Sequence, residues 1–363
     1  MRVLVVNAGS SSLKLRLLGP DDALLADCEL PAGAAGFDEQ AVAAAVEPMT
    51  GVEAIGHRFV HGGARLSGPT LLDPGVEDYL GSLTGLAPLH QALALAGVRL
   101  MRRLRPSAPE VACLDTAFHA TLPAAAATYA VPREWRERLG VRRFGFHGLS
   151  HAYAARRAAE LLGRPQERLR TVTCHLGAGA SLAAVRFGVS VDTTMGFTPL
   201  EGIIMATRSG TVDPGLVLWL QRQAGLSEPA LTDALENQSG LLALAGSADM
   251  RDVLRGAGAG DPNARLGLDV YVYRLRSAVA AMAAAMEGLD SLVFTGGVGE
   301  HAAEVRAAAA SGLAFLGVAL DGERNAAAAG DADVSAAGAR VRTLVVQARE
   351  DLEIARQVRS LLG

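Results

Sequence analysis

The sequence predicts an α/β protein, and three observations support this prediction. The chain has 363 residues, which is enough for two domains of ordinary size. Half of the residues are apolar and only 4% are aromatic, so we expect cores built mainly from Leu, Val and Ala. Segments with strand patterns alternate along the chain with segments of helical periodicity, which is typical of the α/β class.

The chain opens with a predicted β-hairpin. Residues 2–6 (RVLVV) and 12–18 (SLKLRLL) have the composition of strands, and residues 7–11 (NAGSS) between them are typical of a turn. The next predicted elements are a strand that runs into a glycine turn, a helix, and a buried strand, at residues 53–63, 90–106 and 110–119.

A second hairpin of the same plan is predicted half a chain later. Residues 170–187 (RTVTCHLGAGASLAAVRF) contain a β-branched run, a Gly-rich turn and a second strand. Ser12-Leu13 and Ser181-Leu182 correspond at an offset of 169 residues (181 minus 12). Such a pair suggests a duplicated fold, but two Gly-rich hairpins also resemble each other by chance. The residues alone leave both explanations open.

Helices and one further strand complete the α/β pattern. An Ala-rich helix, a long helix, a strand with a double-glycine turn and a helix, and an amphipathic last helix are predicted at residues 151–163, 268–289, 291–310 and 349–362. Two looser segments are expected to be surface loops or helix ends, at residues 256–264 and 326–339.

Charge and cysteine content exclude several classes of protein. The net charge of −4 provides no global basic field, which argues against nucleic acid as a partner. Cys28, Cys113 and Cys174 are widely spaced, and we expect reduced thiols in a cytoplasmic protein. We also expect no signal peptide and no membrane association, because no long apolar segment follows the N-terminus and no run reaches about 18 apolar residues.

Three Gly-rich turns favour a nucleotide site. They follow apolar strands at residues 7–12 (NAGSSS), 175–181 (HLGAGAS) and 294–301 (FTGGVGEH). Glycine lets backbone N–H groups approach phosphate closely, and serine hydroxyls add donors. The chain has no GxxxxGK[ST] motif and no GxGxxG that opens a βαβ unit, so the P-loop and Rossmann classes are disfavoured.

Lys14 is the single lysine among 34 Lys and Arg residues. It follows the first of these turns, where a compact ammonium suits phosphate oxygens better than a planar guanidinium. The alternative is a surface lysine without a function.

Two arginines and two carboxylates are further candidates. Arg58 and Arg208 lie in tight turn contexts, where each either grips a carboxylate or phosphoryl group or forms a structural ion pair. Asp115 ends a predicted buried strand and is suited to orient an arginine or a metal-bound water. Glu350 is expected to precede the last helix, where its carboxylate is suited to complete a Mg²⁺ site.

Ten ordered motifs resemble the signatures of the acetate kinase family. They are NAGSSSLK, HRFVHGG, LAPLH, DTAFH, RRFGFHGLSH, HLGAGAS, DTTMGFTPLEG, TRSGTVDPG, NQSGLL…DMRD and FTGGVGE. The resemblance covers nearly the whole chain and implies a duplicated ribonuclease H-like fold with a nucleotide cleft between two domains. The implied domains are residues 1–118 plus 351–363 and residues 119–350. The implied reaction is reversible phosphoryl transfer between ATP and acetate, giving ADP and acetyl phosphate, with Mg²⁺ or alternatively Mn²⁺, in a homodimer.

The resemblance also implies a role for each matching residue. Asn7 and Glu350 would hold the metal, and Lys14, Ser10 and Ser12 would face the phosphates. Arg58 would bind the acetate carboxylate, Arg208 and His147 would stabilise the transition state, and Asp115 matches an essential aspartate. The residues implied around ATP are His175, Leu176, Gly177, Ala178, Gly179, Asp249, Met250, Arg251, Gly297, Val298, Gly299, Glu300 and His301. The residues implied around the acyl methyl group are Val60, Leu89, Phe146 and Pro199.

The chemistry of the substrate suggests a role for Asp115. A carboxylic acid with a pKa of about 4 to 5 is already ionised at pH 7 and needs no base. We therefore interpret Asp115 mainly as a residue that orients Arg58 or metal-bound water. Catalysis then consists of positioning and charge neutralisation in an in-line transfer.

The sequence departs from the family pattern in several places. Ala178 stands where the family usually has Asn, which removes a side-chain donor to ATP, and Glu350 lies in an altered context, AREDLEIAR. The alternatives are a propionate or butyrate kinase, or a non-catalytic nucleotide switch of the Hsp70 or actin kind, since one fold hosts several functions. A sugar kinase is disfavoured because the predicted acyl pocket is apolar.

Overall fold

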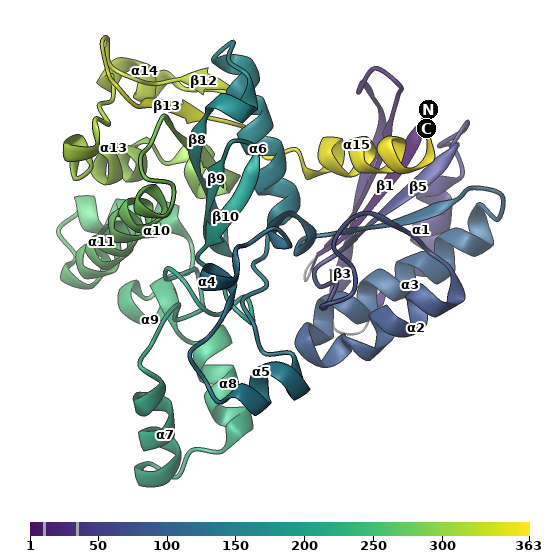
Figure 1. The fold of residues 1–363 in the computed structure, drawn as a ribbon, viewed down its shortest axis with the longest axis horizontal. Coiled ribbons are helices and arrows are strands. Elements are labelled where there is room, and N and C mark those ends of the chain that lie inside the picture. The colour runs from purple at the N-terminus through teal and green to yellow at the C-terminus, as the bar shows by residue number, and fades with distance from the viewer. Residues whose placement is uncertain (10–11, 34–35) are drawn as a thin grey trace. The chain divides into compact units, whose positions relative to one another are not determined.

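The computed structural model describes residues 1–9, 12–33 and 36–363 (Figure 1). Contacts within the chain divide it into two compact units. The first unit contains Met1–Ala120, Phe146–Tyr153 and Arg349–Gly363, and the second contains Thr121–Gly145 and Ala154–Ala348. Each unit is built on one mixed sheet with helices packed against it, so the predicted α/β class is confirmed.

The first unit has a sheet with the strand order β4-β3-β2-β1-β5-β7-β6. Its strands are β1 (Val3–Ala8), β2 (Ser12–Leu18), β3 (Leu24–Gly33), β4 (Gly36–Phe37), β5 (Ala54–Phe59), β6 (Thr70–Leu71) and β7 (Glu110–Leu114). Strands β1, β5 and β7 run parallel to one another, and the remaining pairs are antiparallel. The predicted opening hairpin is β1 and β2.

Helices cover both faces of this sheet. They are α1 (Glu39–Val46), α2 (Pro74–Ser82), α3 (Pro88–Leu104) and α15 (Glu350–Leu362). Because side chains alternate along a strand, Leu4 and Val6 of β1 pack with α1 and α3, whereas Val3 and Val5 pack with α15. The last helix thus returns to the first strand, and the two chain ends lie side by side (Figure 1).

The close approach of α15 to the sheet depends on Gly56 of β5. A Cβ atom at this position would meet the side chains of Ile354 and Val358 of α15 at 2.5 and 2.9 Å. Such distances are shorter than van der Waals contact, so a larger residue would push α15 away from the sheet.

The second unit has a sheet with the strand order β10-β9-β8-β11-β13-β12. Its strands are β8 (Arg170–Leu176), β9 (Ala180–Arg186), β10 (Val189–Thr193), β11 (Ser291–Thr295), β12 (Ala332–Asp333) and β13 (Arg342–Val345). Its helices are α4 (Ala124–Ala127), α5 (Arg133–Leu139), α7 (Pro214–Gln223), α8 (Glu228–Asn237), α9 (Gly240–Ala245), α10 (Met250–Gly258), α11 (Pro262–Ala285), α12 (Gly296–His301), α13 (Ala303–Ser311) and α14 (Gly322–Ala327). Helix α6 (Gly148–Leu161) begins in the first unit and continues into the second.

The two sheets share one topology. In each, three antiparallel strands (β3-β2-β1 and β10-β9-β8) are followed by two parallel strands and a short antiparallel strand. The two hairpins predicted from the sequence, β1–β2 and β8–β9, occupy equivalent places. This order is that of a duplicated ribonuclease H-like fold, so duplication rather than chance explains their similarity.

Several predicted boundaries differ from the structure. The double glycine at Gly296-Gly297 is the first turn of helix α12 and not a separate turn. Helix α11 begins at Pro262, before the predicted residue 268, because Asp261 caps its N-terminus and Pro262 suits the first helical position. Within the described residues, no helix has the length and apolar character needed to cross a membrane.

Candidate active site

Three neighbouring parallel strands of the first unit end in polar residues on one face of the sheet. Asn7 lies near the end of β1, Arg58 near the end of β5, and Asp115 directly after β7. Alternation places all three on the face that α15 covers. The first residue of α15 is Glu350, which therefore meets them. We call Asn7, Arg58, Asp115 and Glu350 the Arg58 cluster.

The guanidinium of Arg58 lies at the centre of this cluster. Its Nε and Nη2 donate to the two carboxylate oxygens of Asp115 at 3.3 and 2.6 Å, and Nη1 donates to Oδ1 of Asn7 at 3.2 Å. Oε2 of Glu350 lies 3.8 Å from Nε of Arg58 and accepts from Nδ2 of Asn7 at 3.0 Å. Two-point pairing with Asp115 fixes the plane of the guanidinium.

Burial and charge act against each other in this cluster. The side chain of Arg58 is 14% exposed and that of Asp115 is 1% exposed. Burial opposes the charge on Arg58, but Asp115 and Glu350 more than offset it, and the net effect raises the pKa of Arg58. Burial also raises the pKa of Asp115, against the opposing effect of Arg58. The ion pair of Arg58 and Asp115 is therefore shielded from water, and its geometry is rigid.

The segment that carries Phe146 and His147 packs against the end of β7. The backbone N–H of Gly148 donates to the carbonyl oxygen of Asp115 at 2.9 Å, and Nε2 of His119 lies 3.0 Å from the carbonyl oxygen of Phe146. His147 adopts a left-handed backbone conformation with φ of 56°. These contacts hold the backbone of His147 close to Asp115, although the two residues belong to separate segments of the first unit.

The predicted acyl-pocket residues are distributed over both units. Val60 and Phe146 are buried in the first unit, at 8% and 1% exposure. Pro199 is partly buried and belongs to the second unit. Leu89 is in helix α3, and its side chain lies outside the described part of the structure.

Lys14 lies beside the Arg58 cluster. It is directly opposite Asn7 on β2, and opposite residues of an antiparallel pair project to the same face. Its side chain is about half exposed, and Nζ lies 3.8 Å from a carboxylate oxygen of Glu29 on β3. Ser12 is the first residue of β2, and Ser10 lies outside the described residues.

In the second unit, the predicted nucleotide residues gather where strands β8 and β11 end. His175 of β8 pairs with Thr295 of β11, so the segments 175–179 and 296–301 begin at the same edge of the sheet. Glu300 accepts hydrogen bonds from the backbone N–H groups of Gly296 and Ala348 at 2.9 and 3.0 Å. Both N–H groups donate to its Oε1, so the carboxylate connects the start of helix α12 to Ala348.

The other predicted nucleotide residues cap helix α10 and form the turn after β8. Asp249 accepts from the backbone N–H of Arg251 at 2.9 Å and pairs with its guanidinium at 2.5 Å. The hydrogen bonds from Arg251 lower the pKa of Asp249 to about 2. Ala178 is exposed, and its carbonyl oxygen accepts from the backbone N–H of Ala206 at 3.1 Å.

Arg208 differs from Arg58 in its partners. Its Nη1 donates to the carbonyl oxygen of Pro199 at 3.3 Å and lies 3.8 Å from the sulfur of Met205. Among the described residues, no carboxylate lies within 4.0 Å of its guanidinium. Burial lowers the pKa of Arg208, and the more distant charge of Glu236 opposes this only in part. A partly buried cation without an ion pair is suited to an anionic ligand.

Comparison with known proteins assigns the family. A family model described as the acetokinase family matches residues 34–356. The chain belongs to the acetokinase family. This chain is 51% identical to the acetate kinase of Synechococcus sp. (strain JA-2-3B'a(2-13)) over 85% of its own length and 76% of that protein. It is 46% identical to the acetate kinase of Leifsonia xyli subsp. xyli over 98% of its own length and 97% of that protein.

Solved structures of an acetate kinase and of a propionate kinase have the same fold. The acetate kinase of Porphyromonas gingivalis superposes with a TM-score of 0.91 at 34% identity, covering 100% of both chains. A propionate kinase from Francisella tularensis subsp. tularensis SCHU S4 superposes with a TM-score of 0.89 at 33% identity, covering 98% of both chains. These matches extend over both units of the acetokinase fold.

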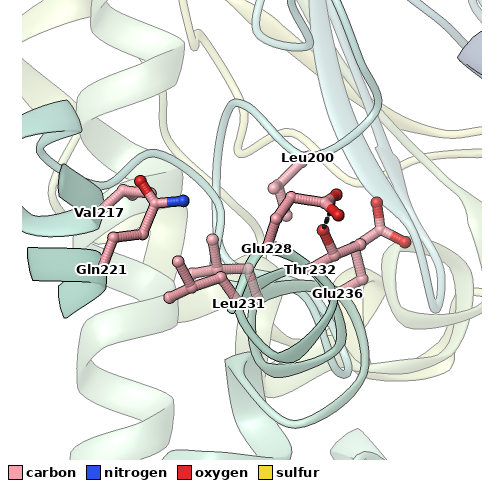
Figure 2. Close-up of a pocket in the computed structure, with 8 residues that line it drawn as sticks. Leu200, Val217, Gln221, Glu228, Leu231, Thr232 and Glu236 are labelled. Carbon is pink, nitrogen blue, oxygen red and sulfur yellow. Dashed lines mark hydrogen bonds between the residues drawn. The ribbon is translucent and has the colours of Figure 1, made fainter. Parts of the chain in front are cut away.

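A small cavity in the second unit of this acetokinase lies beside the loop that carries Pro199 and Arg208. It has a volume of about 160 Å³ and lies between helices α7 and α8 (Figure 2). Leu200, Val217 and Leu231 supply apolar walls, and Glu228 accepts a hydrogen bond from Thr232 at 3.2 Å. Its described lining includes none of the residues predicted from the sequence, so we do not regard it as the active site.

Sequence reasoning missed several residues that shape the candidate site. Tyr129 and Arg143 contact Glu201 in the loop that also carries Pro199 and Arg208, and His119 supports Phe146. Three of these four lie within quoted motifs: Arg143 in RRFGFHG, Glu201 in TPLEG and His119 in DTAFH. The motifs were therefore a signal, but they did not indicate which backbone each side chain holds.

Proposed function

We propose that this acetokinase catalyses the reversible transfer of the γ-phosphoryl group of ATP to acetate, giving ADP and acetyl phosphate. The arrangement of Arg58 is the observation that carries the proposal. A guanidinium has five N–H donors, and the described contacts to Asp115 and Asn7 use three of them. Two donors remain, one on each Nη atom, and we propose that they bind a second carboxylate.

The reaction needs positioning more than proton transfer. Acetate is ionised at neutral pH, so its oxygen attacks the γ-phosphorus directly while the bond to ADP breaks in line. Asp115 then acts as the residue that orients Arg58, because both of its oxygens are engaged by that guanidinium. Arg208 and His147 are proposed to stabilise the charge on the transferring group.

The Arg58 cluster also offers oxygen ligands that fit Mg²⁺. Glu350 supplies a carboxylate and Asn7 an amide, and the two side chains are in contact. The described residues hold no group of three or more His, Cys, Asp or Glu suited to a metal. Mg²⁺ usually takes only one or two carboxylates and completes its shell with water and substrate phosphates, so a two-residue site is sufficient. When bound, Mg²⁺ or Mn²⁺ would neutralise phosphate charge.

The residues proposed to bind ATP lie at strand ends and at the start of a helix in the second unit. The segments 175–179 and 297–301 lie at the carboxyl ends of neighbouring parallel strands, where α/β sheets usually bind ligands. Asp249, Met250 and Arg251 begin helix α10. We propose that these segments surround ATP and that Lys14, Ser10 and Ser12 face its phosphates.

Acetate is the proposed acid, and propionate is the alternative. Val60 and Phe146 of the first unit, with Leu89 and Pro199, remain our candidates for contacts with the methyl group. The similarity to a propionate kinase keeps the alternative open. One methylene group changes selectivity by only about 1 to 3 kcal/mol, so some turnover of propionate is expected.

Three coarser features belong to the same proposal. The proposed domains are residues 1–118 plus 351–363 and residues 119–350; the return of α15 to the first sheet supports this division, whereas residues 119–120, 146–153 and 349–350 pack with the first unit. The protein acts as a homodimer, as the family resemblance implies. It resides in the cytoplasm, which is consistent with the free thiols of Cys28, Cys113 and Cys174.

Trapping the acyl phosphate with hydroxylamine tests the proposal. The protein is incubated with ATP and Mg²⁺, and with acetate, propionate, butyrate or no acid. We expect most hydroxamate with acetate, less with propionate and none without acid. ATP binding or slow hydrolysis without any hydroxamate would instead indicate a nucleotide switch.

A further inference from the structure

A long irregular loop carries two of the proposed active-site residues. Residues 194–213 connect β10 to α7 and contain no helix or strand, yet Met195, Ile203 and Met205 within them are buried. Pro199 and Arg208 belong to this loop. Thr194 at its start still bonds to Leu182 of β9, but the loop forms no strand of its own, so other groups must satisfy most of its backbone and fix its shape.

Arg143 holds the beginning of the loop. Its Nη1 lies within hydrogen-bond distance of three successive carbonyl oxygens, those of Thr193, Thr194 and Met195, at 3.2, 3.1 and 3.0 Å. Its Nη2 donates to Oε1 of Glu201 at 2.5 Å. One guanidinium therefore connects the start of the loop to a residue further along it.

Tyr129 connects to the same glutamate. Its hydroxyl donates to Oε2 of Glu201 and accepts from the backbone N–H of Phe197 at 3.0 Å. Burial raises the pKa of Tyr129 to about 12, so the phenol keeps its proton at neutral pH and remains a donor. The guanidinium of Arg143 also lies 5.5 Å from the centre of the Tyr129 ring. We call Tyr129, Arg143 and Glu201 the Glu201 clamp.

The clamp leaves no space beside Gly196. A Cβ atom at this position would overlap both the carboxylate of Glu201 and the hydroxyl of Tyr129. The carbonyl oxygen of Gly196 accepts from the backbone N–H groups of Phe144 and Gly145 at 3.0 and 3.3 Å. The loop thus passes tightly along the segment that contains Arg143.

The clamp reaches the active-site residues through Pro199. Phe197 and Glu201, on either side of Pro199, are both held by Tyr129. The carbonyl oxygen of Pro199 in turn accepts from Nη1 of Arg208 at 3.3 Å. A shift of the clamp therefore moves both Pro199 and the partner of Arg208.

We propose that Tyr129, Arg143 and Glu201 are positioning residues that set Pro199 and Arg208 and thereby determine selection of the acyl acid. This inference rests on the proposed function, since it assigns a role in the same reaction. None of the three residues needs to touch substrate. They act by setting the positions of Pro199 and of Arg208 within the second unit.

Two substitutions test this role: Tyr129→Phe, which removes both hydrogen bonds of the phenol, and Glu201→Gln, which removes the charge. Tyr273→Phe is the matched control, because Tyr273 is 66% exposed on helix α11 of the same unit. Hydroxamate assays give kcat and KM for acetate, propionate and ATP. We expect kcat/KM for acetate to fall about tenfold and the preference for acetate over propionate to fall severalfold, because misplacement by a fraction of an ångström is costly. The KM for ATP should change little.

The double variant adds a test of coupling. If the residues act as one unit, the double variant loses about as much activity as the worse single variant, whereas independent residues give additive losses. Wild-type selectivity and kcat in folded variants with a lower Tm would overturn the inference and leave the clamp a structural feature. Wild-type protein that forms no hydroxamate from any acid would instead remove the proposed function and, with it, this inference.

Discussion

Replacing Arg208 by alanine should separate catalysis from stability. Arg208 is a partly buried cation whose direct contacts are a carbonyl oxygen at 3.3 Å and a sulfur at 3.8 Å. A transition-state arginine in phosphoryl transfer contributes about 10³-fold or more to kcat. A loss of 10³-fold corresponds to about 4 kcal/mol of activation free energy.

The effect on stability should be much smaller. The substitution removes one long hydrogen bond, worth about 1 kcal/mol, and the packing of the side-chain stem. It also removes the cost of burying a charge that has no ion pair, which acts in the opposite direction. We therefore expect the free energy of unfolding to change by no more than about 1 kcal/mol, which moves Tm by a few degrees at most.

The assay combines hydroxamate kinetics with thermal unfolding of Arg208→Ala, with Arg208→Lys as the variant that keeps the charge. Arg274→Ala is a matched control, because it removes an exposed arginine from helix α11 of the same unit. Arg208→Ala with a kcat within tenfold of wild type would refute the transition-state role. A kcat loss accompanied by a large fall in Tm would refute the argument that the charge is poorly compensated.

Three further predictions follow from the described contacts. Asp115→Asn should lower the free energy of unfolding by about 3 kcal/mol, because it leaves the buried Arg58 without the charged carboxylate of Asp115. It should also raise the KM for acetate more than the KM for ATP. An unchanged KM for acetate would contradict the orienting role. Burial lowers the pKa of His119 to about 4, against the opposing hydrogen bond to Phe146, so the neutral ring stabilises the fold above its ordinary pKa near 6.5 and this stability is lost as pH falls toward 4. Between pH 8 and pH 5 the free energy of unfolding of the wild type should therefore fall by about 2 kcal/mol more than that of His119→Gln, as measured by urea unfolding at both pH values. An equal fall in both proteins would argue against this prediction. Ala178→Asn should lower the KM for ATP severalfold by adding a side-chain donor, and an unchanged or higher KM in the same kinetic assay would show that this position does not contact the nucleotide.

The strand ends of the first unit could be predicted because their signals are local. Asn7 and Asp115 each follow a short apolar run, Arg58 lies in the strand predicted at residues 53–63, and carboxyl ends of parallel strands meet at one edge of a sheet. The contact of this edge with Glu350 could not be derived in the same way. It depends on α15 packing closely over Gly56, an approach between segments that lie about 300 residues apart.

The Glu201 clamp illustrates a second limit. Arg143 and Tyr129 are 58 and 72 positions from Glu201, and their hydrogen bonds to Thr194, Met195, Phe197 and Glu201 are all made to an irregular loop. Such a loop has no hydrophobic period, so periodicity predicts neither its path nor the backbone groups that need partners. The motif around Glu201 was visible, but its hydrogen bonds to Tyr129 and Arg143 required the folded chain.

The two arginines proposed for this reaction solve different electrostatic problems. Around Arg58, two carboxylates face one guanidinium, so the local charge is negative and does not by itself attract acetate or phosphate. Arg58 must therefore act through the fixed geometry of its remaining N–H donors. The additional positive charge that an anionic substrate needs has to come from another group, and the cation proposed at Asn7 and Glu350 would supply it. Arg208 has no carboxylate within 4.0 Å among the described residues, so its charge is available to an anion. The fixed donors of Arg58 therefore suit recognition of the acid. The uncompensated charge of Arg208 suits a transition state in which negative charge is redistributed over the transferring group.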